Sequence, residues 1–116
     1  MRFALKIGVF ALLSSFGFVA GATGSERDTA PAGSRTIKAK DIDFTPARIS
    51  VKRGTVVSWR FLDSTLHNVT SRGKRRFRSS RSMRTGTHEA RFRQAGRYRY
   101  VCTIHPLSMQ GVVAVR

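Results

Sequence analysis

Four side chains of metal-binding type stand in the second half of the chain. Cys102, His105 and Met109 fall within one short segment, and His67 stands well before them. Thiolate and thioether sulfurs are soft donors and imidazole is borderline, whereas calcium and magnesium require oxygen donors. Two histidines, one cysteine and a weakly bound methionine form the donor set of copper electron-transfer sites. Zinc is the main competitor, but its structural sites use Cys and His without a thioether. We therefore expect these four residues to hold one copper ion.

Residues 1–22 have the pattern of a secretory signal peptide. Arg2 and Lys6 give a positively charged start, an apolar stretch follows over 7–20, and small residues at 20–22 offer a cleavage site. The apolar stretch is shorter than the roughly 20 residues of a membrane-spanning helix. An uncleaved membrane anchor is the alternative interpretation. We expect 1–22 to be removed and the rest to be exported to the periplasm or the cell exterior.

The cysteine count supports a chemical role for Cys102. Exported proteins usually pair their cysteines as disulfides, yet this chain has a single cysteine. A lone cysteine in an exported protein is a liability, an intermolecular bridge, an inert buried residue or a functional thiol. The other metal-binding side chains close to it favour the functional interpretation.

The elements that must position these residues are β-strands. Residues 23–35 are rich in Gly, Ser, Thr, Ala and Pro and predict a flexible segment, so the folded domain is expected over 36–116. Short β-branched and aromatic runs separated by turn residues predict an all-β sandwich of about seven or eight strands. These runs fall near 36–44, 49–51, 55–61, 67–71, 89–92, 97–102 and 112–115. The segment 73–84 is too highly charged for a core strand and is expected to be an external loop.

Within that pattern, Cys102 ends one predicted strand and Met109 precedes the next. The residues between them therefore form a strand-to-strand loop that can fold around one ion. His67 begins another predicted strand and would reach the same end of the sandwich.

The motifs that surround the four donors resemble those of one known family. They are Phe44-Thr45-Pro46, Gly54-Thr55-Val56-Val57-Ser58-Trp59, His67-Asn68-Val69, and Gly96 to Pro106 followed by Met109, Gly111 and Val112. From Ile42 to Arg116 the chain is similar to cupredoxins of the plastocyanin, amicyanin and pseudoazurin group. The resemblance implies a Greek-key β-sandwich and one blue type 1 copper that cycles between Cu(II) and Cu(I). It implies His67, Cys102 and His105 as ligands, Met109 as a weak axial ligand, and Asn68 as a residue that fixes the ligand loop near the thiolate.

Two features depart from the family pattern. Leu66 precedes His67 where many relatives carry proline, and three residues separate His105 from Met109. The corresponding gap is usually longer in plastocyanins and shorter in amicyanins. The assignment of Met109 as the axial ligand therefore rests on a His-to-Met spacing that differs from the usual spacing of both groups.

The resemblance also implies how electrons would enter and leave. The exposed edge of His105 would be the electron port, and Leu66, Pro106 and Leu107 would form a small apolar docking patch around it. The chain would then be an electron carrier and not an enzyme, since copper reductases and oxidases need further copper ligands and this chain has three histidines. A non-redox protein that carries or buffers copper for a cuproenzyme is the alternative function.

The charge of the chain indicates an anionic partner. The formal net charge is +16, which informs about partners and not about fold. A basic loop contains Arg72, Lys74, Arg75, Arg76, Arg78, Arg81 and Arg84. It is expected to dock an acidic redox partner, with an anionic membrane or cell-wall surface as a second possibility and a plain solvated loop as the simplest one. Nucleic acid is not expected, because Phe77 is the sole aromatic of the loop and such sites interleave several. We expect a monomer.

Overall fold

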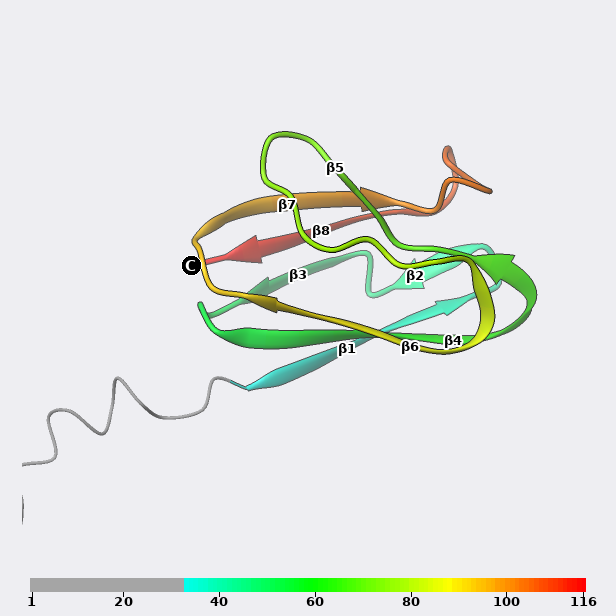
Figure 1. Ribbon diagram of the computed structural model, residues 1–116, viewed down its shortest axis with the longest axis horizontal. Coiled ribbons are helices and arrows are strands. Elements are labelled where there is room, and N and C mark those ends of the chain that lie inside the picture. The colour runs from blue at the N-terminus through cyan, green and yellow to red at the C-terminus, as the bar shows by residue number, and fades with distance from the viewer. Residues whose placement is uncertain (1–32) are drawn as a thin grey trace, which may run out of the picture.

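The computed structural model describes residues 33–116, which form eight β-strands. The strands are β1 Ser34–Lys40, β2 Asp43–Thr45, β3 Arg48–Val51, β4 Thr55–His67, β5 Thr70–Arg72, β6 Met83–Phe92, β7 Gly96–Val101 and β8 Gln110–Val115. They build two four-stranded sheets, with the orders β2-β1-β4-β6 and β3-β8-β7-β5, which Figure 1 shows as two layers. The expected all-β sandwich is confirmed.

An aromatic core joins the two sheets. Along β4 the side chains of Val57, Trp59 and Phe61 are fully buried and alternate with more exposed ones, as the two-residue period of a strand requires. The Trp59 ring meets the ring of Tyr100, on β7 of the other sheet, edge to face at a centroid distance of 5.3 Å. Phe44 contacts the same Tyr100 ring at 4.9 Å. The sheets are therefore held face to face by large, interlocking rings.

The segment between β5 and β6, residues 73–82, differs from the external loop that its charge predicts. It runs beside β5, where Ser80 N donates to Val69 O at 2.8 Å and the Ser71 N–H donates to Ser79 Oγ at 2.9 Å. Its Phe77 ring turns inward and stacks parallel to Trp59 at 5.3 Å. The prediction was right for the arginines, which are exposed, and wrong for Phe77, which is half-buried against the core.

Several strand boundaries also differ from those expected. β1 begins at Ser34, ahead of the predicted domain start at 36, because Ser34 and Arg35 already pair with β4 in parallel register. β4 continues through an irregularity after Leu62 as far as His67, so His67 ends a strand and does not begin one. β6 begins at Met83, earlier than the expected strand near 89–92.

The proposed signal peptide, 1–22, lies outside the described residues. Within the described part of the chain there is no helix long and apolar enough to cross a bilayer.

Candidate metal centre

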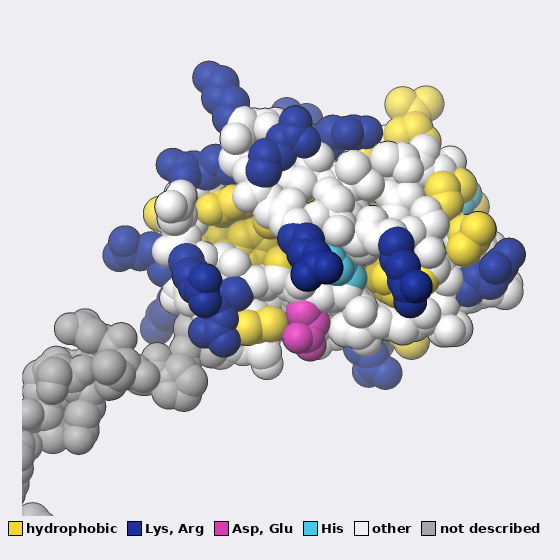
Figure 2. Space-filling model, viewed as in Figure 1, with side chains coloured by type: hydrophobic (Ala, Val, Ile, Leu, Met, Phe, Trp, Pro, Cys, Tyr) yellow, Lys and Arg dark blue, Asp and Glu magenta, His cyan; other side chains and the backbone are white. Residues whose placement is uncertain are grey.

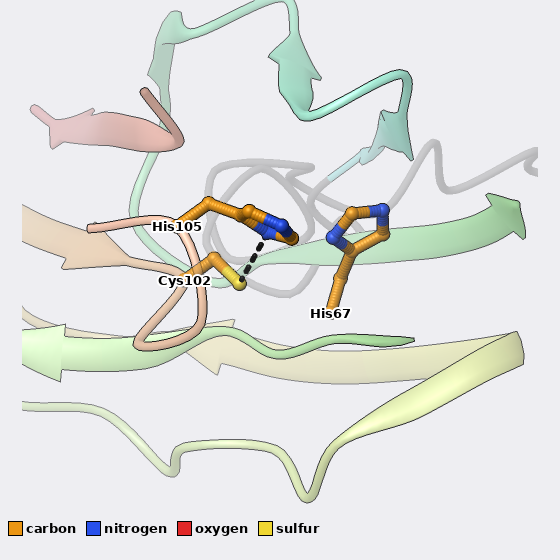
Figure 3. A group of neighbouring side chains, drawn as sticks. All are labelled: His67, Cys102 and His105. Carbon is orange, nitrogen blue, oxygen red and sulfur yellow. Dashed lines mark hydrogen bonds between the residues drawn. The ribbon is translucent and has the colours of Figure 1, made fainter. Parts of the chain in front are cut away.

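The three strongest metal-binding candidates meet at one end of the sandwich (Figure 3). His67 ends β4 in one sheet, while Cys102 directly follows β7 in the other, and His105 lies in the loop between β7 and β8. One ligand atom from each of these residues lies within 4.8 Å of the other two. Residues far apart in the sequence are thus brought together because the strands that carry them pack face to face.

The loop from Cys102 to Met109 is closed by its own backbone. The Cys102 N–H donates to Met109 O at 3.0 Å, which continues the pairing of β7 with β8 for one more step. The N–H groups of His105 and Met109 donate to Cys102 O and His105 O, at 3.2 and 2.9 Å. These bonds hold the loop in a tight turn, and the Met109 side chain is fully buried beneath it.

His67 is oriented by a carboxylate that the sequence motifs do not include. Its Nε2 lies 3.1 Å from Asp63 Oδ2, and its Nδ1 is buried with no hydrogen-bond partner among the described residues. The His67 hydrogen bond is the largest cause that holds the pKa of Asp63 far below its usual range, followed by the backbone N–H groups of Asp41 and Thr65. A carboxylate at Nε2 favours the proton on that nitrogen and leaves the lone pair on Nδ1 free for a metal.

Cys102 and His105 face each other across the site. Cys102 Sγ lies 3.8 Å from His105 Nδ1, the contact drawn in Figure 3. Cys102 is fully buried, whereas His105 is half-buried and reaches the surface. The imidazole rings of His67 and His105 are 5.2 Å apart at their centroids. His105 is therefore the one of these three residues through which the site is exposed to solvent.

Asn68 ties the two halves of the site together. Its Nδ2 donates to Thr103 Oγ1 at 2.8 Å, and its Oδ1 accepts from the Thr103 N–H at 3.0 Å. The same side chain also bonds Ser82 and Thr70. Because Thr103 follows Cys102, these bonds connect the end of β4 to the ligand loop.

Exposed apolar residues lie on the ligand loop beside His105 and next to His67. Leu107 is 91 % exposed and Leu66 is 36 % exposed, and Pro106 is also exposed. Ile104 is a further exposed apolar residue on the ligand loop and was not among the predicted patch residues. Figure 2 shows hydrophobic side chains and a histidine together at the right-hand end, where Figure 1 places this loop.

The seven cations of the predicted basic loop divide into two groups. Three make hydrogen bonds within the described chain: Arg75 to Gln94 Oε1, Arg76 to Ser71 O and Arg84 to Ser64 O. The side chains of Arg72, Lys74, Arg78 and Arg81 are exposed and make none with described residues, although the backbone oxygen of Arg78 lies 2.7 Å from His88 Nε2. Three of the seven side chains thus contribute to the fold, and the other four are free to bind an anion.

Tyr100 packs behind the site. Its hydroxyl lies against Gly111, the residue opposite it on β8, and a side chain there would collide with the ring. The ring is buried, and this burial raises the pKa of Tyr100 to about 12. Gly111 is needed at this position because the phenol occupies the space of its missing side chain.

The donors fit a single copper ion. Two imidazole nitrogens and a thiolate sulfur converge in a buried position, with a fully buried thioether residue at the base of the loop. The free Nδ1 of His67 is a buried acceptor that needs a partner, and an ion at the meeting point of the three ligand atoms would supply it. Soft sulfur combined with imidazole is the environment that copper prefers.

Known proteins are similar to this chain in sequence and in fold. A family model described as a cupredoxin-like domain matches residues 9–115. Amicyanin-alpha of Methylorubrum extorquens is 29 % identical over 99 % of this chain and 97 % of its own length. A purple cupredoxin of Nitrosopumilus maritimus superposes with a TM-score of 0.64 at 27 % identity, covering 71 % of this chain and 99 % of the other. An amicyanin variant in its reduced Cu(I) form gives a TM-score of 0.61 at 25 % identity, covering 72 % and 82 %.

Proposed function

Because the chain belongs to the cupredoxin-like domain family, we propose that it is an exported electron carrier with one copper ion, and not an enzyme. Members of this family that resemble amicyanin bind one copper. The observation that carries the proposal is the convergence of His67, Cys102 and His105 within 4.8 Å, at the end of the sandwich where Met109 is buried.

In this proposal His67, His105 and the Cys102 thiolate would hold the copper, and the Met109 thioether would be a further, weaker ligand. The bound copper supplies the chemistry by gaining and losing one electron between Cu(II) and Cu(I). The chain's residues keep the surroundings constant: Asp63 fixes the His67 ring, Asn68 fixes the loop through Thr103, and burial keeps water from Cys102. A preformed site of this kind needs little rearrangement when the charge changes.

His105 would be the electron port of the carrier. It is the member of the three-residue group that is not fully buried. Its neighbours in the chain, Ile104, Pro106 and Leu107, are exposed and apolar, as is Leu66 beside His67. Apolar contact expels water from between two proteins and lets them approach closely. Because the patch is small, the partner can also dissociate quickly after the electron has been transferred.

The redox partner would be acidic. Removal of Arg2 and Lys6 with the leader lowers the formal net charge from +16 to +14, and a charge of this size accelerates encounter with an anionic surface. The exposed cations of the basic loop, Arg72, Lys74, Arg78 and Arg81, would contribute to this attraction. The carrier would act as a monomer in the periplasm or outside the cell, after removal of 1–22, and without nucleic acid.

Voltammetry combined with copper exchange separates this function from that of a non-redox copper carrier. The copper-loaded protein is adsorbed on an electrode, and its copper is challenged with a chelator in a parallel experiment. An electron carrier gives a reversible one-electron wave and loses copper slowly. Rapid loss of copper to the chelator without a reversible wave would contradict the proposal and support copper delivery.

A further inference from the structure

The charges of the described residues are divided unequally between the two sheets. The carboxylates Asp41, Asp43, Asp63 and Glu89 all lie on the sheet β2-β1-β4-β6 or on its turns. The described strands β3, β8, β7 and β5 carry none, and their side chains include Arg48, Arg72, Arg97 and Arg99. Figure 2 shows Lys and Arg over much of the visible face, several of them along the top, where Figure 1 places β7 and β8, and a carboxylate in the lower half. One face of the sandwich is therefore uniformly cationic.

Strand register places these arginines in one row across the outer face. Arg72 on β5 pairs with Arg99 on β7, and Arg99 pairs with Val112 on β8. Val112 in turn pairs with Arg48 on β3. Side chains of directly paired residues point to the same face of a sheet, and all three arginines are exposed while their chain neighbours Ile49, Ser71 and Tyr100 are buried. Arg97 lies on the same face, two residues before Arg99.

The row contains a like-charge repulsion that no ion pair within the described residues relieves. Like charges directly opposite on neighbouring strands repel each other, and Arg72 faces Arg99 in this way. No Lys or Arg of the described part forms an ion pair with a described carboxylate. The guanidinium groups of this row therefore have their donors available for an external anion.

The arginines border a hollow in the sheet face. It has a volume of about 690 Å³, with Arg48, Arg72, Arg97 and Arg99 at its border and small or aliphatic residues such as Ala47, Gly73 and Val112 between them. The hollow exists because glycine and alanine occupy positions beside long arginine side chains. We call it the arginine hollow.

We propose that the arginine hollow docks a protruding acidic segment of the redox partner. The arginines stand on β3, β7 and β5, and neighbouring strands are about 4.8 Å apart, so the row is too wide for one small anion and suits several separate carboxylates. Guanidinium groups bind carboxylates with two parallel hydrogen bonds. A planar lipid surface would meet only the rim of a concave site. The occupant, a redox partner, rests on the proposed function.

The arginine hollow lies close to the ligand loop, so it can hold a partner near the metal site. Val101, which ends β7, borders the hollow, and Cys102 is the next residue. A partner held by the arginines thus lies beside the ligand loop, with the apolar patch around His105 at the adjoining end. The hollow would supply attraction and orientation, while the apolar patch supplies close contact.

The test uses the full-length chain and two probes, a synthetic glutamate-rich peptide and vesicles of anionic phospholipid. The variant R48Q/R97Q/R99Q removes three charges from the hollow. The control K38Q/R60Q/R91Q removes three exposed charges from the opposite sheet, so the net charge of the two variants is equal. Binding is measured by titration at moderate salt, and backbone amide shifts are followed by NMR during the peptide titration.

We expect the hollow variant to bind the peptide about tenfold or more weakly, because three exposed ion pairs are lost together. The control should lose less than about twofold, and the shifts should cluster on β3, β7 and β8. Equal losses in both variants, no loss, or shifts confined to 102–109 would overturn the proposal. Tighter binding to vesicles that depends on the same arginines would also overturn it, in favour of a membrane. The visible spectrum of the copper form tests the function separately.

Discussion

At the scale of single residues, the two ring nitrogens of His67 have different surroundings and different roles. Nε2 is held by Asp63, and Nδ1 is buried without a partner among the described residues and lies near Cys102 and His105. A carboxylate that holds the outer nitrogen of a metal-binding histidine fixes the ring and makes the inner nitrogen a stronger donor. Asp63 is therefore a positioning residue for the metal site.

Replacing Asp63 with Ala should weaken copper binding about 10–100-fold, because the His67 ring loses its fixed orientation. Competition with a chelator of known affinity measures the change. Asp43→Ala is the matched control, since Asp43 is an exposed carboxylate of the same sheet and has no contact with His67. Equal affinities for both variants would show that Asp63 does not position the ligand.

Tyr100 should make the fold sensitive to alkaline pH. An unfolded tyrosine loses its proton near pH 10.0, whereas buried Tyr100 keeps it until about 12. Between these values the unfolded state binds fewer protons than the folded one, so the free energy of unfolding falls as pH rises. Tyr100→Phe should lack this part of the loss. Denaturant titrations of the metal-free protein through this pH range test it, and identical pH slopes in both proteins would contradict it.

The candidate metal ligands could be chosen from the sequence because their identity is chemical. A thiolate, two imidazoles and a thioether indicate a site for a soft metal wherever the chain brings them together. The motifs around these residues also resemble those of one family. Asp63 could not be found in this way. Its contact with His67 depends on the irregularity of β4 between Leu62 and His67, which no side-chain pattern records.

At the scale of elements, the segment 73–82 closes the side of the sandwich between β5 and β6. It uses serine hydroxyls instead of a regular strand ladder: Ser71 and Val69 donate their backbone N–H groups to Ser79 Oγ and Ser80 Oγ. Phe77 then fills the space beside Trp59 and contacts Phe92 at 5.2 Å. A highly charged segment is thus anchored by one ring and several hydroxyls.

Phe77→Ala should lower the free energy of unfolding by about 2 kcal/mol, somewhat less than for a fully buried ring, because Phe77 is half-buried. Arg78→Ala removes the exposed neighbour and should change it by no more than about 0.5 kcal/mol. Denaturant unfolding followed by Trp59 fluorescence measures both. An effect of Phe77→Ala as small as that of Arg78→Ala would mean that the ring does not anchor the segment.

Most strands could be predicted, since alternating apolar residues and turn glycines mark them. Residues 55–61 and 97–102 are clear examples, and the structure places β4 and β7 there. The start of β6 at Met83 could not be predicted, because 83–88 is exposed or half-buried and lacks an apolar period. Its place is set by pairing with the long β4 and not by burial of its own side chains.

At the scale of the whole molecule, charge rather than shape should control encounter. The net charge is +16, and the described carboxylates lie on one sheet or its turns. Such a field attracts anions over distances comparable with the Debye length, which is about 10 Å at 0.1 M salt and about 3 Å at 1 M.

Oxidation of the Cu(I) protein by an anionic reagent such as ferricyanide should therefore slow down as salt is added. Oxidation by a cationic cobalt complex should become faster, because salt then screens a repulsion. Stopped-flow measurements over a series of salt concentrations give both rates. Rates that are independent of salt for both reagents would contradict a role for the cationic surface in encounter.

We propose that Cys102, His67 and His105 bind one copper ion together, with Met109 as the weak fourth ligand. The most direct test is the visible and paramagnetic-resonance spectrum of the purified protein with one equivalent of Cu(II). We predict an intense visible colour that disappears on reduction, is absent from Cys102→Ser, and persists in Met109→Leu with a changed reduction potential. A colourless protein whose Cys102 thiol still reacts with thiol reagents after copper is added would contradict the account.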